Sequence, residues 1–121
     1  MSDQRIKNIL LHMLEDLTDI QKFTEGFDYQ RLLEDKLVSK AIGMCILNIG
    51  EGVKNLPTDF HDQNADVPWK SIVAMRNRVA HGYHSLDYEI VWGIVKNDVP
   101  QLIPVIQKEL RRMREKEEPS R

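Results

Sequence analysis

The chain has 121 residues, of which 41% are hydrophobic and 30% charged, and its formal net charge is −2. This length and composition predict one soluble globular domain over residues 1–121. The near-neutral charge argues against unspecific coating of nucleic acid, and we expect no DNA ligand. A single cysteine, Cys45, excludes an intramolecular disulfide. We see no signal peptide and no apolar run long enough to cross a bilayer, so we expect a cytoplasmic protein without a membrane partner.

The first predicted helix covers residues 3–25. Ser2 or Asp3 can cap its start, and Gly26 can end it. Its apolar residues recur three and four positions apart, which is the spacing of one helix face. They are Ile6, Ile9, Leu10, Met13, Leu14, Leu17, Ile20 and Phe23.

The second predicted helix covers residues 28–56 and is stopped by Pro57. Glycine disfavours a helix by about 1 kcal/mol relative to alanine, so we interpret its glycines as points where another helix packs closely. Cys45 lies between apolar neighbours, which indicates a buried, unreactive thiol. Six residues roughly follow one face of this helix: Leu33, Leu37, Ala41, Cys45, Asn48 and Gly52.

The rest of the chain predicts a loop followed by two or three helices. Residues 57–68 show no periodicity and indicate the loop, and a third helix then begins at Pro68 and ends near Gly82. Asp87 can cap a fourth helix. The stretch from residue 97 continues it or forms a fifth, with a break or kink at two prolines. The prolines are Pro100 and Pro104, and the core-facing residues beyond them are Leu102, Ile103, Ile106, Leu110 and Met113.

No segment shows the alternation of a half-buried strand. The fold class is therefore predicted to be all-α, an up-down bundle of four to five helices. The tail from about residue 114 is charged, and we expect it to fray.

One window of this mildly acidic chain contains no carboxylate: residues 67–86 lack both Asp and Glu. Within it lie two arginines, two histidines and a tyrosine, namely Arg76, Arg78, His81, His84 and Tyr83. Taken singly, each has a structural explanation; a histidine near a helix C-terminus, for example, is favoured by the helix dipole. Taken together without a counter-charge, they indicate a site for phosphate or for an acidic protein patch.

The spacing within this window sets a geometric condition. Asn77 and His81 are four apart and share a helix face, whereas Arg76 and His81 are about 140° apart around an ideal helix. The latter two converge if the helix loosens near Gly82, if the arginine side chain wraps round, or if a second copy of the chain supplies the partner. His81 and His84 lack further ligands nearby, so we expect neither a metal site nor another cofactor.

The stretch "RNRVAHGY", residues 76–83, resembles the signature of the HEPN superfamily, specifically its DUF86 or HepT ribonuclease toxins. That signature is an arginine, a polar residue, three further residues, histidine, any residue and tyrosine. The resemblance extends to "LEDKLVSKAIGMCILNIGEGVKNL", with its "IGE" at residues 49–51, to "VPWKSIVAMRNRVAHGY", and to "LDYEIVWGIVKNDVPQL". It therefore covers most of the chain, from about Ile6 to Leu110.

The resemblance implies a homodimeric helical bundle in which the motif helices of two copies meet in a cleft. It implies metal-independent cleavage of RNA, in several members of tRNA, within a toxin–antitoxin system. It also implies a cognate MNT-type nucleotidyltransferase antitoxin that neutralises the toxin by transferring AMP to the motif tyrosine, here Tyr83.

The residue types suit that chemistry. An imidazole titrates near neutrality, so His81 can move a proton, and the Arg76 guanidinium can stabilise charge on phosphorus. Asn77 can orient His81 or the phosphate. Arg78 and His84 are candidate phosphate contacts.

Two other interpretations remain open. The first is a non-catalytic helical dimer whose basic cleft binds a nucleotide or the acidic face of a partner. The second is a structural bundle in which the basic window is an accident of packing. RNA turnover separates the ribonuclease interpretation from both.

Overall fold

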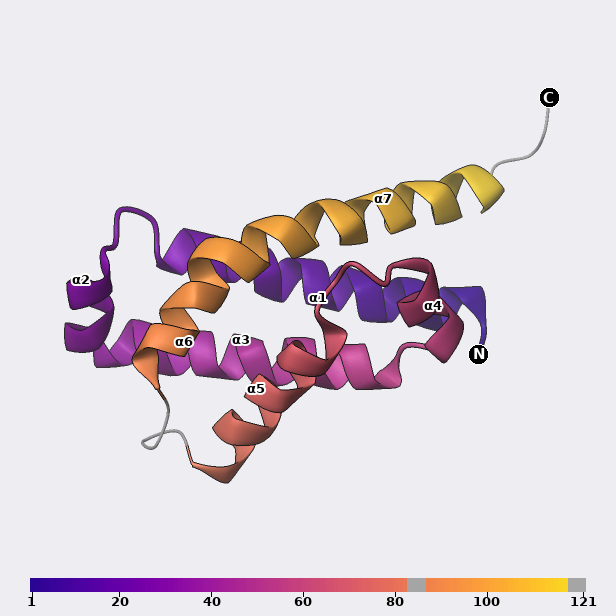
Figure 1. The fold of residues 1–121 in the computed structure, drawn as a ribbon. Coiled ribbons are helices and arrows are strands. Elements are labelled where there is room, and N and C mark those ends of the chain that lie inside the picture. Colours follow the sequence, from indigo (N-terminus) through magenta and orange to yellow (C-terminus); the bar gives the residue numbers. More distant parts are fainter. Residues whose placement is uncertain (83–86, 118–121) are drawn as a thin grey trace.

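The computed structural model of the chain describes residues 1–82 and 87–117, and it is all-α as predicted. No strand occurs in these two ranges. Figure 1 shows three long helical segments, α1, α3 and α7, lying roughly along one direction, with α5 crossing beside α3.

Helix α1 (Asp3–Phe23) begins and ends as the sequence predicts. The Ser2 hydroxyl accepts a hydrogen bond from the backbone N–H of Arg5, 3.2 Å away, and so caps one of the free N–H groups at the helix start. Beyond the helix, Gly26 adopts a positive φ of 77° in the turn. The buried face of α1 contains Leu10, Met13, Leu17 and Ile20.

The single helix predicted over residues 28–56 is wrong in one respect, because the chain forms two helices there. These are α2 (Tyr29–Glu34) and α3 (Lys36–Asn55). Asp35 has a non-helical ψ of 91°, and its side chain accepts a hydrogen bond from the N–H of Val38. An aspartate that caps a new helix competes with helix continuation at that residue, which explains the break.

The face of α3 predicted to be apolar is also wrong. Leu37 is 81% exposed and Leu33 of α2 is 43% exposed. Of the predicted face only Cys45 is buried, and the buried residues of α3 are Ser39, Ile42, Gly43, Cys45, Ile46, Ile49, Gly50 and Val53. Two neighbours rather than one cover α3, because it packs against both α1 and α5.

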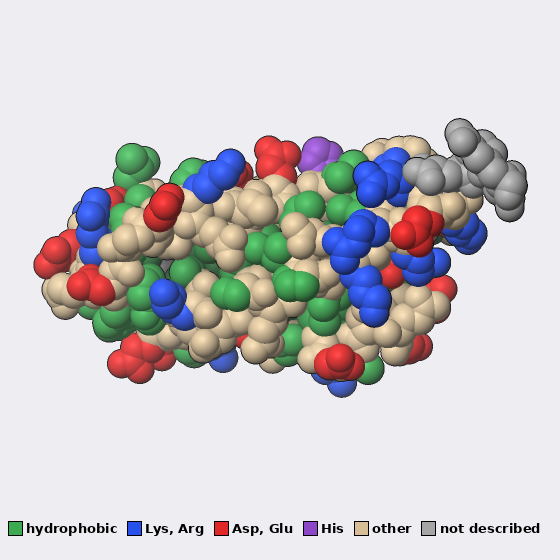
Figure 2. Space-filling view, turned by 90° about the horizontal axis from the view of Figure 1, so that it is seen from above, with side chains coloured by type: hydrophobic (Ala, Val, Ile, Leu, Met, Phe, Trp, Pro, Cys, Tyr) green, Lys and Arg blue, Asp and Glu red, His purple; other side chains and the backbone are tan. Residues whose placement is uncertain are grey.

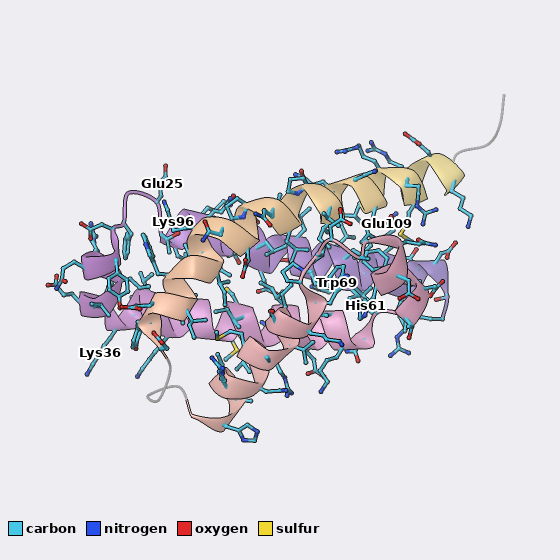
Figure 3. All side chains as sticks on the ribbon, viewed as in Figure 1. Glu25, Lys36, His61, Trp69, Lys96 and Glu109 are labelled. Carbon is cyan, nitrogen blue, oxygen red and sulfur yellow. The ribbon has the colours of Figure 1, made fainter. Side chains whose placement is uncertain are left out.

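The predicted loop over residues 57–68 contains a short helix, α4 (Thr58–Gln63), which corrects that prediction. Its buried Phe60 packs on Trp69, with the ring centroids 5.8 Å apart. His61 stacks on the same indole at 5.0 Å, and its Nε2 lies 2.9 Å from the carbonyl oxygen of Val53 (Figure 3). These contacts explain why a polar segment becomes helical, and they fix the start of α5.

Helix α5 (Trp69–His81) follows the prediction, and Gly82 ends it. The Trp69 indole N–H donates to the carbonyl oxygen of Asn64 at 3.0 Å, so the first residue of the helix is anchored on both its ring and its polar edge. Met75 and Val79 are buried, and Ile72 and Val73 are partly buried against the core.

The last part of the chain runs through α6 (Tyr88–Gly93), the π-helical segment η2 (Ile94–Asp98) and α7 (Val99–Glu117) without interruption. Asp87 caps α6 as predicted, by accepting from the N–H of Glu89 at 2.9 Å. The chain does not break at either proline: Pro100 lies in the first turn of α7 and Pro104 lies inside it. A proline is tolerated in the first turn of a helix, and the wider π turns come directly before Pro100. Leu102, Ile106 and Met113 are buried as predicted, and the helix continues through residues 114–117.

Three helix pairs form most of the core: α3 with α5, α1 with α3, and α1 with α7. Glycines lie at the first two contacts, as the sequence predicts. A Cβ added at Gly52 would lie 2.7 Å from Cγ of Met13, and one added at Gly50 would overlap Cβ of Arg76. At Gly50 the two helices therefore approach so closely that a side chain does not fit, whereas at Gly52 an added methyl group would meet the side chain of Met13.

Figure 2 shows the face that carries α7, where lysine and arginine side chains gather toward the C-terminal half of that helix. This surface differs from the one carried by α5. In the part of the chain that the structure describes, no helix has the length and apolarity needed to span a membrane.

We predict that Gly50→Ala destabilises the chain by about 1–3 kcal/mol, because the new methyl group overlaps Arg76 and forces α3 and α5 apart. Gly93→Ala is the matched control. Gly93 has a helical φ of −58° and no described atom within 4 Å of the added Cβ, so alanine should be neutral or stabilising by up to about 1 kcal/mol. Urea unfolding measures both; equal stability of the two variants would contradict the close contact at position 50.

Candidate functional site

Helix α5 is regular α-helix from Trp69 to His81, so it presents its polar residues in a fixed order. Arg76 is half-buried and faces α3, whereas Asn77, Arg78 and His81 are exposed. The backbone N–H of Gly82 donates to the carbonyl oxygen of Arg78 at 3.1 Å, which closes the last turn directly after His81. Tyr83 and His84, the remaining predicted site residues, lie outside the described residues.

The guanidinium of Arg76 is held from two sides. Its Nη2 lies 3.0 Å from Oε2 of Glu51 on α3, and its Nη1 donates to Oδ1 of Asn77 at 3.0 Å. Its Nε is buried and has no hydrogen-bond partner within residues 1–82 and 87–117. The arginine is therefore fixed at the junction of α3 and α5.

The prediction that this basic window has no counter-charge is wrong for Arg76. The window itself holds no carboxylate, but Glu51 comes from another helix and forms an ion pair with the guanidinium. The close approach of α3 and α5 at Gly50 brings the two side chains together. Sequence spacing alone does not reveal a pair that depends on tertiary contact.

The hydrogen bond to Asn77 bears on how Arg76 and His81, which point in different directions on an ideal helix, could act on one ligand. The helix does not loosen before His81, so that route to convergence is not used. Instead the arginine side chain turns toward Asn77, which is one turn from His81 on the same face. Asn77 thus accepts from the guanidinium, a contact that the sequence analysis did not specify.

A pocket of about 320 Å³ lies between α1 and α3, and Glu51 is one of its lining residues. Its lining residues are Ile9, His12, Met13, Asp16, Asn48, Glu51 and Gly52. Burial raises the pKa of the Asp16 carboxyl above its ordinary value, while a hydrogen bond from Asn48 opposes the shift. Within the described ranges, no three His, Cys, Asp or Glu side chains come together as a metal site.

Cys45 interacts with Asp16, which lines this pocket, and it is buried, as predicted. Burial raises the pKa of its thiol to about 12, and the nearby carboxylates of Asp16 and Asp19 act in the same direction. Because the thiolate is the reactive form, the folded chain keeps this sulfur inert at physiological pH.

The sequence matches one ribonuclease family model and several relatives whose names refer to ribonuclease activity. The family model described as "Ribonuclease HepT-like" matches residues 13–109. A "Putative RNase" of Methanocaldococcus jannaschii is 38% identical over 108 residues, which is 89% of each chain. A second "Putative RNase" of that organism is 35% identical, over 84% of this chain and 94% of its own. "Probable ribonuclease HepT" of Thermococcus cleftensis is 32% identical, over 79% and 87%. No solved structure is a significant match to the chain.

We predict that iodoacetamide alkylates Cys45 at pH 8.5 at least about 100-fold more slowly in the folded chain than in urea. The thiol pKa is raised to about 12 in the fold, so thiolate forms there only well above the pH at which the unfolded chain titrates. Intact mass against time measures the rate. Equal rates with and without urea would contradict the buried position of the thiol.

Proposed function

Because this chain belongs to the ribonuclease HepT-like family, we propose that it is a metal-independent endoribonuclease that acts through Arg76 and His81. The observation that carries the proposal is the Arg76–Asn77 hydrogen bond, which directs a fixed cation toward the helix face of an exposed histidine. An RNA phosphate, in tRNA or in another RNA, is the substrate group that suits this pair.

The proposed reaction uses the ribose 2′-hydroxyl as nucleophile. Its oxygen forms a bond to the neighbouring phosphorus as its proton leaves, and the bond from phosphorus to the next nucleotide's 5′ oxygen breaks. That 5′ oxygen takes up a proton, so the products are a cyclic phosphate and a free 5′-hydroxyl. His81 moves a proton, and Arg76 stabilises the charge that gathers on the phosphate oxygens.

We further propose that the active form is a homodimer in which two α5 helices face one cleft. The reaction needs one group that accepts a proton and one that donates it. His81 is exposed at the end of α5, and a two-fold contact near that end brings two copies of it together. One imidazole can then act as the base and the other as the acid. Arg78, exposed on the same helix, and His84 are proposed phosphate contacts.

The cellular role we propose is that of a cytoplasmic toxin, neutralised by a cognate MNT-type nucleotidyltransferase antitoxin. That antitoxin would transfer AMP to Tyr83, two residues after His81 in the sequence. An adenylate there adds bulk and negative charge at the cleft, so it would exclude RNA by occupancy and by repulsion of the phosphates.

We predict that His81→Ala abolishes RNA cleavage in EDTA while the chain still binds RNA. The side chain is exposed at a helix end, so its loss should leave folding intact. A 5′-labelled RNA and analysis of its ends for cyclic phosphate measure the reaction.

Lys70→Ala, an exposed cation at the opposite end of α5, is the control and should cleave like the native chain. Full activity of His81→Ala would exclude the assigned role of this histidine. Native chain that binds RNA but does not turn it over would favour the alternative, a non-catalytic binding dimer.

We also predict that co-expression with an MNT-type nucleotidyltransferase of the proposed antitoxin class adds AMP to the chain and stops RNA cleavage. Tyr83→Phe should block the addition, because the acceptor hydroxyl is lost, although Tyr29 and Tyr88 remain. Intact and peptide masses measure the modification. AMP on Tyr29 or Tyr88 in place of Tyr83 would refute the proposed site.

A further inference from the structure

We propose that Glu51 is a positioning residue for Arg76: it holds the guanidinium so that N–H groups on both terminal nitrogens stay available for the substrate phosphate. This inference rests on the proposed function and assigns a role to a residue outside the sequence motif. It follows from the ion pair between α3 and α5 and from the hydrogen bond that the guanidinium donates to Asn77.

The proposal follows from which N–H donors of Arg76 are already engaged within the chain. A guanidinium has five N–H donors: one on Nε and two on each terminal nitrogen. The Nε is buried, one N–H of Nη1 donates to Asn77, and Nη2 forms the ion pair with Glu51 at 3.0 Å. The two terminal nitrogens carry four N–H groups, so the described contacts leave N–H groups on both of them. A phosphate accepts hydrogen bonds from such groups.

The backbone places Glu51 for this role. Gly50 lets α3 approach Cβ of Arg76, so the next residue, Glu51, lies beside the guanidinium rather than beyond it. The Arg76 side chain is 27% exposed and that of Glu51 is 49% exposed. The pair therefore lies at the surface, where RNA can reach it, and is not enclosed in the core.

Positioning matters because a long arginine side chain is otherwise free to rotate. Ordering it in the unliganded chain removes that cost from the reaction step, and a catalytic group misplaced by about 1 Å can lose about 100-fold in rate. The Glu51 side chain is long enough to place a carboxylate oxygen beside the Arg76 guanidinium. It does not need to neutralise charge, and its negative charge in fact opposes a phosphate nearby.

Two conservative variants distinguish the effect of side-chain length at position 51 from the effect of its negative charge. Glu51→Gln keeps the length of the side chain and an acceptor oxygen but removes the charge. Glu51→Asp keeps the charge but is shorter by one methylene, so it cannot span the 3.0 Å contact without movement of α3 or α5. Glu15→Gln and Glu15→Asp, on an exposed glutamate of α1, are the matched controls.

We expect Glu51→Asp to lower kcat for RNA cleavage about 10–100-fold with little change in KM. We expect Glu51→Gln and both Glu15 variants to stay within about threefold of the native kcat. Urea unfolding checks that the four variants fold alike. The positioning role would be overturned if Glu51→Gln lowered kcat more than Glu51→Asp does. It would also be overturned if both Glu51 variants were impaired, or if both kept the native kcat.

A second measurement does not depend on cleavage. The side-chain Nε–H signal of Arg76 in nitrogen-15 NMR should report an ordered guanidinium in the native chain and in Glu51→Gln, and a mobile one in Glu51→Asp. If native chain cleaves no RNA, the proposed function fails while this measurement still decides the positioning role. Equal order in all three proteins would overturn the inference.

Discussion

The contact between α3 and α5 at Gly50 is the constraint on which the candidate site depends. Any side chain at position 50 would overlap Cβ of Arg76, so the distance between the two helices is set by the absence of one methyl group. That distance decides what faces the arginine. It places a carboxylate from α3 beside the guanidinium, in a stretch of α5 that has no acidic residue of its own.

The same contact converts a flexible cation into an oriented one. An isolated arginine on a helix surface samples many rotamers, and ordering such a side chain has an entropic cost. Here the packing of the core, one hydrogen bond and one ion pair order the side chain before any ligand arrives. The stability of the bundle and the geometry of the site are therefore coupled, and a packing change far from any RNA can alter the chemistry.

The sequence predicts the parts of this molecule that depend on neighbouring residues. Caps at Ser2 and Asp87 and the helix end at Gly82 follow from local hydrogen bonding, and the structure has all three. Asp35 was missed, because an aspartate inside a helical pattern reads as an exposed residue until its side chain is seen to cap Val38. The predicted face of α3 was wrong because it included Leu37, which is exposed. Hydrophobicity alone does not indicate which sides of α3 are covered by α1 and α5. The Glu51–Arg76 pair joins distant positions, and no local pattern carries it.

The π-helical segment before α7 has a consequence for how the family can vary in length. A π turn holds one more residue than an α turn while the chain completes the same rotation about the helix axis. Removing one residue from Ile94–Asp98 would therefore restore α-helical winding and leave the direction of the later side chains nearly unchanged. Leu102, Ile106 and Met113 would still face the core. A one-residue difference in length can thus be absorbed inside this segment, whereas the same deletion within α7 would turn every later side chain by about 100°.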